Sequence, residues 1–166
     1  MIDQRLAAYL QVFGAVLVEG PKWFGKTWTS LAHASSASYL DKKSTRNLAT
    51  IDPRYIFTSS WPQLIEEWQA VPSIWDTVRH ECDTDSVKGK FILTGSTSLT
   101  KSQQEESVFH SGTGRIASIR METMSLFELG ASSGTASIEA MHEGTLQTGY
   151  ARKVEHYTKD FITRRN

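Results

Sequence analysis

Along this chain, stretches in which apolar residues recur every three or four positions alternate with short, uninterrupted apolar runs. The first pattern is typical of helices that bury one face, and the second is typical of strands buried on both faces of a sheet. Helices are predicted at residues 2–12, 26–34 and 44–57, the last broken at Asp52-Pro53. Another is predicted to begin with Ser73 as its N-cap and to end at about Cys82.

The uninterrupted apolar runs are short and predict five strands, several of them bounded by glycine. These strands are expected at residues 14–20, 38–41, 62–68, 90–95 and 114–121. Because strands and helices alternate along the chain, we expect an α/β fold with a mainly parallel sheet between helices.

The pattern weakens after the last predicted strand. Residues 98–113 are polar and predict a loop plus a helix, and residues 126–129 predict a helical turn that ends at Gly130. Ser, Gly and Thr dominate residues 131–148, which is typical of a mobile connection. Beyond it, four apolar residues at steps of four, three and four predict one more helical face: Tyr150, Val154, Tyr157 and Phe161. We therefore expect a domain over residues 1–130, and a flexible connection with a helix over 131–166.

Composition excludes several classes of protein. The 166 residues are 39% apolar, enough for the core of one domain. A single cysteine, Cys82, excludes an internal disulfide framework and a multi-cysteine zinc site. No run approaches the roughly 18 apolar residues of a membrane span. No signal-peptide pattern opens the chain, so a cytoplasmic location is expected.

Charge is balanced overall, at 18 Lys and Arg against 18 Asp and Glu, but it is unevenly spread. Residues 1–50 and 151–166 each carry a net charge of +3, and the stretch between them is acidic. Chance variation on a solvated surface explains this distribution. The alternative is a basic end that contacts a phosphate or a partner, and it is the only support here for binding to nucleic acid.

One motif dominates the candidate chemistry. Gly20-Pro-Lys-Trp-Phe-Gly25-Lys26-Thr27 matches G-x-x-x-x-G-K-[ST] between a predicted buried strand and a predicted helix. Glycines let the backbone wrap closely around a phosphate, and the helix N-terminus attracts its charge. Lys26 is expected to reach the β- and γ-phosphates, and the Thr27 hydroxyl to ligate Mg²⁺. The expected nucleotide-binding residues are Gly20, Pro21, Lys22, Trp23, Phe24, Gly25, Lys26, Thr27 and Trp28.

The aromatic residues of this loop admit two interpretations. Trp23 and Phe24 could flank a nucleotide or pack on the sheet, and packing is the prediction. Trp61, Trp68 and Trp75 are expected in the core or at subunit contacts.

A carboxylate at the end of a neighbouring strand should accompany such a loop. Glu66 and Glu67 follow Leu64-Ile65, so Glu66 is expected to face the metal and Glu67 to act as general base toward a water. The metal-side residue is usually Asp. The extra methylene of Glu66 moves its carboxylate by roughly 1 Å, a misplacement that can cost about 100-fold in rate. Two surface acids at a strand end remain the alternative.

Two further polar residues have candidate roles. Thr94 ends an apolar run, which would place its hydroxyl beside the γ-phosphate and the water; a simple turn is the alternative. Arg115 opens the last predicted strand and could stabilise charge on the γ-phosphate, in cis or from a neighbouring subunit, or be a surface residue.

Together these residues resemble the AAA-type ATPase domain of bacterial and archaeal ATP-binding proteins that carry an uncharacterised C-terminal domain. The resemblance extends over about residues 1–130, and it rests on blocks that follow the family order. These blocks are Gly20 to Thr27, Tyr39-Leu40-Asp41, Asp52-Pro53, Glu66-Glu67-Trp68-Gln69, Val71-Pro72, Phe91 to Ser96, Gly114-Arg115 and Met124 to Leu129.

The resemblance implies an AAA-like P-loop NTPase sheet of five strands, ATP as ligand and Mg²⁺ as cofactor. It also implies that this chain is the N-terminal portion of a longer protein and stops within a connecting helix. The apolar face of that helix has either lost its partner or folds back on the core, and it would favour self-association if exposed. The expected function is Mg²⁺-dependent ATP hydrolysis. The alternatives are a non-hydrolysing nucleotide switch or a catalytically impaired fragment of a longer ATPase; a small-molecule kinase is disfavoured because residues 97–115 hold no Arg-rich lid.

Overall fold

The computed structural model describes residues 2–84, 87–96, 112–125, 128–130, 132, 142 and 144. The chain divides into two units, residues 1–122 and 123–166, which are described separately. The helix expected over 150–161 lies outside the described residues, as do nearly all of the segments expected over 98–113 and 131–148.

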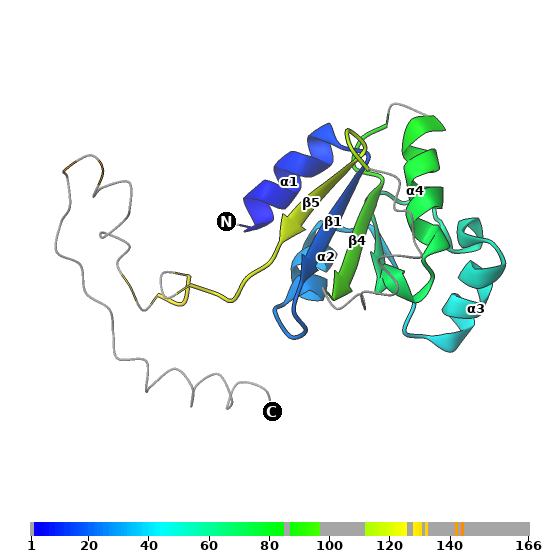
Figure 1. Cartoon of the computed structure of the whole chain (residues 1–166), viewed down its shortest axis with the longest axis horizontal. Coiled ribbons are helices and arrows are strands. Elements are labelled where there is room, and N and C mark those ends of the chain that lie inside the picture. The colour runs from blue at the N-terminus through cyan, green and yellow to red at the C-terminus, as the bar shows by residue number, and fades with distance from the viewer. Residues whose placement is uncertain are drawn as a thin grey trace. The chain divides into compact units, whose positions relative to one another are not determined.

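The first unit is built on a five-stranded sheet in which every pair of neighbouring strands is parallel (Figure 1). The spatial order is β2-β3-β4-β1-β5, so β1 lies between β4 and β5. The strands are β1 (Ala15–Gly20), β2 (Ser36–Tyr39), β3 (Gln63–Glu66), β4 (Phe91–Ser96) and β5 (Ile116–Arg120). The predicted α/β class and five-stranded parallel sheet are confirmed.

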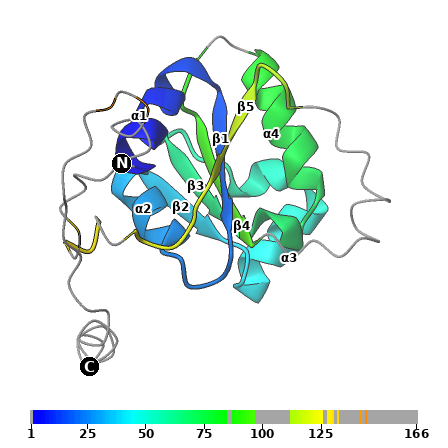
Figure 2. The ribbon, with the colours of Figure 1, turned by 60° about the vertical axis from the view of Figure 1, so that its left-hand side comes forward.

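Helices cover both faces of this sheet. Figure 2 shows α1 and α2 on one side and α3 and α4 on the other. Their bounds are α1 (Ile2–Val12), α2 (Lys26–His33), α3 (Lys43–Ile51) and α4 (Ser73–Thr84), with short 3-10 helices η1 (Pro53–Ile56) and η2 (Trp68–Ala70). Within the described residues, no helix is both long enough and apolar enough to cross a membrane.

Alternation along the central strands creates two separate cores. In β4, Ile92 packs with Leu6 of α1, whereas Leu93 packs with Ile74 of α4. Successive side chains of a strand point to opposite faces, so a strand covered on both sides needs an uninterrupted apolar sequence. This requirement explains why the apolar runs located β1 and β4 so well.

Several element boundaries differ from the prediction. β2 begins at Ser36, before the predicted Ser38, because these serine hydroxyls donate to the carbonyl oxygens of Ser60 and Ile56 (2.7 and 3.0 Å). Apolar periodicity does not detect a strand supported by hydroxyl groups. β3 ends at Glu66 because Glu67 adopts a left-handed conformation (φ 55°) and starts η2.

Both ends of α4 also differ from the prediction. Ser73 is the first residue of this helix and not its N-cap, and the helix continues to Thr84, beyond the predicted end at Cys82. The Thr84 hydroxyl donates to the His80 carbonyl oxygen (3.0 Å), and this hydrogen bond stabilises the last turn of the helix.

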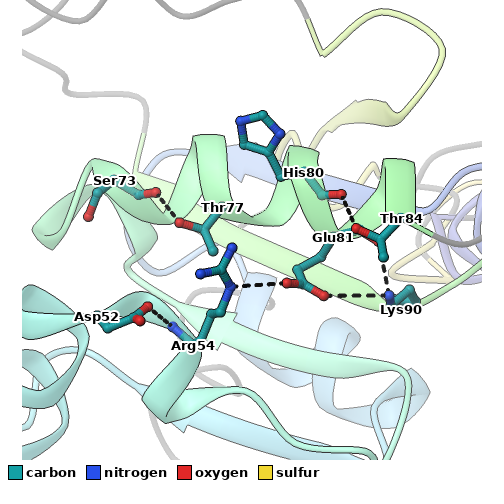
Figure 3. A network of polar contacts seen from close by, with 8 residues as sticks. All are labelled: Asp52, Arg54, Ser73, Thr77, His80, Glu81, Thr84 and Lys90. Atoms are coloured by element: carbon teal, nitrogen blue, oxygen red, sulfur yellow. Dashed lines mark hydrogen bonds and ion pairs between the residues drawn. The ribbon is translucent and has the colours of Figure 1, made fainter.

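A polar network joins η1, α4 and the start of β4 (Figure 3). Asp52 caps η1 by accepting from the Arg54 N–H (2.9 Å), and Arg54 Nε lies 3.3 Å from Glu81 Oε1. Lys90 Nζ donates to the Glu81 carbonyl oxygen (3.0 Å) and lies 3.9 Å from Glu81 Oε2. The Lys90 ammonium also lies 4.8 Å from the Trp61 ring centroid, in cation–π geometry. The Lys90 side chain is only 3% exposed, and the Glu81 carboxylate lies close enough to stabilise its buried charge.

The second unit contains a capping box. The Ser125 N–H and hydroxyl both donate to Glu128 Oε2 (2.9 Å), and the Glu128 N–H donates back to the Ser125 hydroxyl. The bond from the Ser125 N–H, with help from its hydroxyl, holds the pKa of Glu128 below its usual value. Residues 128–130 form a turn in which Gly130 has φ 68°, which agrees with the predicted helical end at that glycine.

Substitution Glu81→Ala should lower the free energy of unfolding by about 1–3 kcal/mol, because it removes a carboxylate that lies 3.9 Å from the buried Lys90 ammonium. Glu122→Ala is the matched control. It breaks an exposed ion pair with Arg120 and should cost under about 1 kcal/mol. Urea unfolding followed by circular dichroism measures both values. Equal stability of the two variants would contradict the role assigned to Glu81.

Candidate functional site: the phosphate loop

The glycine-rich loop connects the end of β1 to the start of α2, as its sequence predicts. Gly20 has φ 153° and Gly25, the N-cap of α2, has φ 83°. A Cβ atom on Gly20 would lie 2.6 Å from the Met121 carbonyl oxygen, and the Met121 N–H is itself bonded to Glu19. Gly20 is therefore required by close packing, and Gly25 by its backbone conformation.

Lys26 is the first residue of α2, and it is buried although lysine rarely is. Its side-chain ammonium donates to the carbonyl oxygens of Gly20 and Pro21, both at 2.8 Å, and the residue is 8% exposed. Burial lowers the pKa of Lys26, while the negative charges of Glu67 and Glu66 oppose that shift. The loop thus holds a desolvated cation beside the two acids named from the sequence.

Thr27 and Glu66 meet at this edge of the sheet. The Thr27 hydroxyl donates a hydrogen bond to Glu66 Oε1, joining the first turn of α2 to the end of β3. A hydroxyl and a carboxylate oxygen are suitable ligands for Mg²⁺, which takes one or two protein oxygens and completes its shell with phosphates and water. The described residues contain no group of three or more His, Cys, Asp or Glu that could hold a metal unaided. The donor set therefore fits a cation that arrives with a phosphate ligand.

Glu67 is the first residue after β3, and its left-handed backbone turns the chain sharply. Its carboxylate oxygen Oε2 accepts a hydrogen bond from the side-chain amide of Gln69. Sequence reasoning placed Glu67 here but gave Gln69 no role. The available signal was a polar residue two positions beyond the acid pair, in a turn otherwise filled by apolar Trp68 and Val71.

Thr94 lies in β4 opposite Glu66 of β3 and Val18 of β1. It is 1% exposed, and within the described residues its hydroxyl has no hydrogen-bond partner. Buried hydroxyl groups nearly always have a partner. A partner from outside this set, such as water or a ligand oxygen, would satisfy it.

Two tryptophans at the phosphate loop, Trp23 and Trp28, are exposed. Trp23 is 85% exposed and has φ 72°, and Trp28 on the first turn of α2 is 82% exposed. The prediction that Trp23 packs on the sheet is wrong, because its left-handed backbone turns the side chain away from the core. Phe24 is partly buried.

Outside the loop, Trp68 and Trp75 agree with the prediction of core residues. Trp68 is buried and stacks on Trp75 with ring centroids 5.2 Å apart, as expected for core residues. Trp61 is not a core residue: it is 39% exposed, and its ring lies over the Lys90 ammonium.

Arg115 lies at the opposite edge of the sheet. Its carbonyl oxygen accepts from the N–H of Ala15, the residue that opens β1, whereas the phosphate loop follows the end of β1. Its guanidinium pairs with Asp83, and this hydrogen bond holds the pKa of Asp83 below its usual value. The in-cis role expected for Arg115 is therefore contradicted, since parallel pairing puts the start of β5 far from the end of β1.

Comparison with known proteins agrees with this arrangement. A family model described as an AAA domain matches residues 13–130, a span that includes the phosphate loop, Glu66, Glu67 and Thr94. No curated protein matches the chain.

Substitution Gly20→Ala should destabilise the protein by more than about 2 kcal/mol, because the new methyl group meets the fixed backbone of Met121. Gly114→Ala is the matched control. Gly114 also has a positive φ, of 80°, but open space surrounds it, so only backbone strain of about 1 kcal/mol is expected. Thermal unfolding of both variants compares the two costs. Equal losses would mean that Gly20 is required for its φ alone.

Proposed function

The chain belongs to the AAA domain family, and from this premise we propose that it binds ATP with Mg²⁺ in the loop of residues 20–28 and hydrolyses it to ADP and phosphate. The observation that carries the proposal is the hydrogen bond between Thr27 and Glu66, formed beside the buried Lys26 ammonium. A hydroxyl, a carboxylate and a desolvated cation at the end of parallel strands suit a triphosphate and its metal ion.

In this proposal the loop exchanges internal bonds for bonds to the nucleotide. Lys26 would leave the carbonyl oxygens of Gly20 and Pro21 and donate to the β- and γ-phosphates. The first N–H groups of α2 and the positive end of its dipole would hold the same phosphates. Thr27 and Glu66 would hold Mg²⁺, which neutralises charge on the phosphate oxygens when bound.

Glu67 would act as the general base. Its carboxylate accepts a proton from water as the water oxygen bonds to the γ-phosphorus, while the bond from that phosphorus to the β–γ bridging oxygen breaks and ADP leaves. The buried hydroxyl of Thr94, which lies opposite Glu66, would orient the water or the γ-phosphate. Arg115 enters this scheme only if a second copy of the chain supplies it.

A non-hydrolysing nucleotide switch is the second candidate, and Glu66 favours it. Glutamate replaces the shorter Asp usual at this position, and a carboxylate displaced by about 1 Å can slow the chemical step by about 100-fold while nucleotide binding persists. Glu66 is the last residue of β3, so the strand fixes where its longer side chain starts.

Isothermal titration of the full chain with ATP and Mg²⁺ tests binding. Lys26→Ala should weaken it by about 10-fold to 100-fold, because a charge-assisted contact to phosphate is lost. Lys88→Ala is the control, since Lys88 is exposed and lies next to the start of β4, at the other edge of the sheet. Unchanged affinity in a folded Lys26→Ala variant would remove the loop as the binding site.

Glu67→Gln separates hydrolysis from binding. The amide keeps the size of the side chain but accepts a proton poorly, so kcat should fall by about 100-fold or more. The affinity for ATP should stay within about 3-fold of wild type, since the proposed base does not hold the phosphates. Phosphate release and calorimetry measure the two quantities. No turnover in a wild-type chain that binds ATP would favour the switch, and an equal fall in affinity would show that Glu67 has another role.

A further inference from the structure

Gln69 connects the proposed general base to a neighbouring strand. Its Nε2 donates to Glu67 Oε2 and lies 3.5 Å from the Ser96 hydroxyl at the end of β4. Ser96 pairs in register with Gly20, where the phosphate loop begins. One side-chain amide thus spans from the end of β3 to the strand that borders the loop.

The backbone is shaped to place this amide. Glu67 is left-handed, and its carbonyl oxygen accepts from the Ala70 N–H (2.9 Å), so the chain folds back within four residues. Trp68 anchors the turn in the core, where it is 5% exposed. The fold-back brings the side chain of Gln69 beside the carboxylate two residues earlier.

Gly95 makes room for the same contact from the side of β4. A Cβ atom at this position would lie 2.7 Å from Gln69 Oε1 and 3.0 Å from Trp68 Nε1. A methyl group here would push the amide away from the strand, at modest cost because Gln69 Oε1 is the far end of a flexible side chain. Two separate segments are therefore adapted to the position of one side chain.

We propose that Gln69 is a positioning residue for Glu67, an inference that rests on the hydrolysis proposed above. A carboxylate on a flexible side chain samples several rotamers. A donor fixed at Oε2 selects one of them and leaves Oε1 to accept the proton of the attacking water. Gln69 suits this task because its amide is neutral, so it orients the carboxylate without the counter-charge of Lys or Arg.

Gln69→Met tests the proposal, since methionine keeps the length and bulk of the side chain but has no donor. We expect kcat to fall by about 10-fold to 100-fold, the scale of a misplaced catalytic group, with KM for ATP nearly unchanged. In the Glu67→Gln background, single-turnover measurements should show no further fall, because Gln69 acts only through Glu67. Multiplicative losses in the double variant would overturn the proposal.

Gln63→Met is the matched control, because it also removes a buried side-chain amide. Gln63 Nε2 donates to the Ile56 carbonyl oxygen (2.6 Å) and to the Ser38 hydroxyl (2.9 Å), at the opposite end of β3. This variant should unfold at a lower temperature yet keep kcat per folded molecule. Gly95→Ala supplies a second approach, because its methyl group should displace Gln69 and reproduce the kcat loss of Gln69→Met. Normal turnover in both Gln69→Met and Gly95→Ala would overturn the proposal.

A measurement independent of turnover completes the test. The side-chain amide signals of Gln69, assigned by their absence in Gln69→Met, should shift in Glu67→Ala and stay in place in Gln63→Met. If the Gln69 amide signals do not shift in Glu67→Ala, the contact between Gln69 and Glu67 does not form, whatever the catalytic rate. A wild-type chain that binds ATP without turnover would overturn the proposed hydrolysis and this role together, whereas wild-type turnover with no effect of Gln69→Met would overturn this role alone.

Discussion

Parallel pairing of β1, β3 and β4 is the constraint on which the site depends. The carboxyl ends of parallel strands lie at the same edge of a sheet, so strand direction alone brings segments that are distant in sequence together there. The order β3-β4-β1 places Glu66 and the phosphate loop on either side of Thr94. The hydrogen bond between Thr27 and Glu66, 39 residues apart, follows from that order.

Several polar groups at this edge bond to one another, whereas the Thr94 hydroxyl has no partner among the described residues. Lys26 bonds to carbonyl oxygens of its own loop, Thr27 bonds to Glu66, and Glu67 accepts from Gln69. Buried polar groups without partners are costly, so these internal bonds let the loop keep its shape. In the proposed function, nucleotide and metal replace internal partners rather than filling an unformed site, which reduces the entropic cost of binding.

At the opposite edge of the sheet, ion pairs stabilise the fold. Lys90 is held by Glu81 beneath Trp61, and Arg115 pairs with Asp83. These contacts connect α4 with η1 and with the starts of β4 and β5. Charged residues at the two edges therefore have different tasks, although they look alike in the sequence.

Local sequence patterns determined much of this protein. Uninterrupted apolar runs located the central strands, because a strand covered on both faces must be apolar at successive positions. The motif from Gly20 to Thr27 predicted the phosphate loop correctly, because the conformation of this loop depends on neighbouring residues: two glycines and the start of a helix. The acids Glu66 and Glu67 were found because they directly follow such a run.

Tertiary structure decided what depends on contacts between distant segments. Arg115 is adjacent to β1 in space, yet the direction of β5 puts it at the wrong edge for the loop, and no local pattern encodes strand direction. Gln69 and Gly95 come together only when η2 folds against β4, where the Gln69 amide fills the space that a Cβ atom on Gly95 would need. Sequence thus determined which residues have suitable chemistry, whereas strand order and packing decided which of them meet.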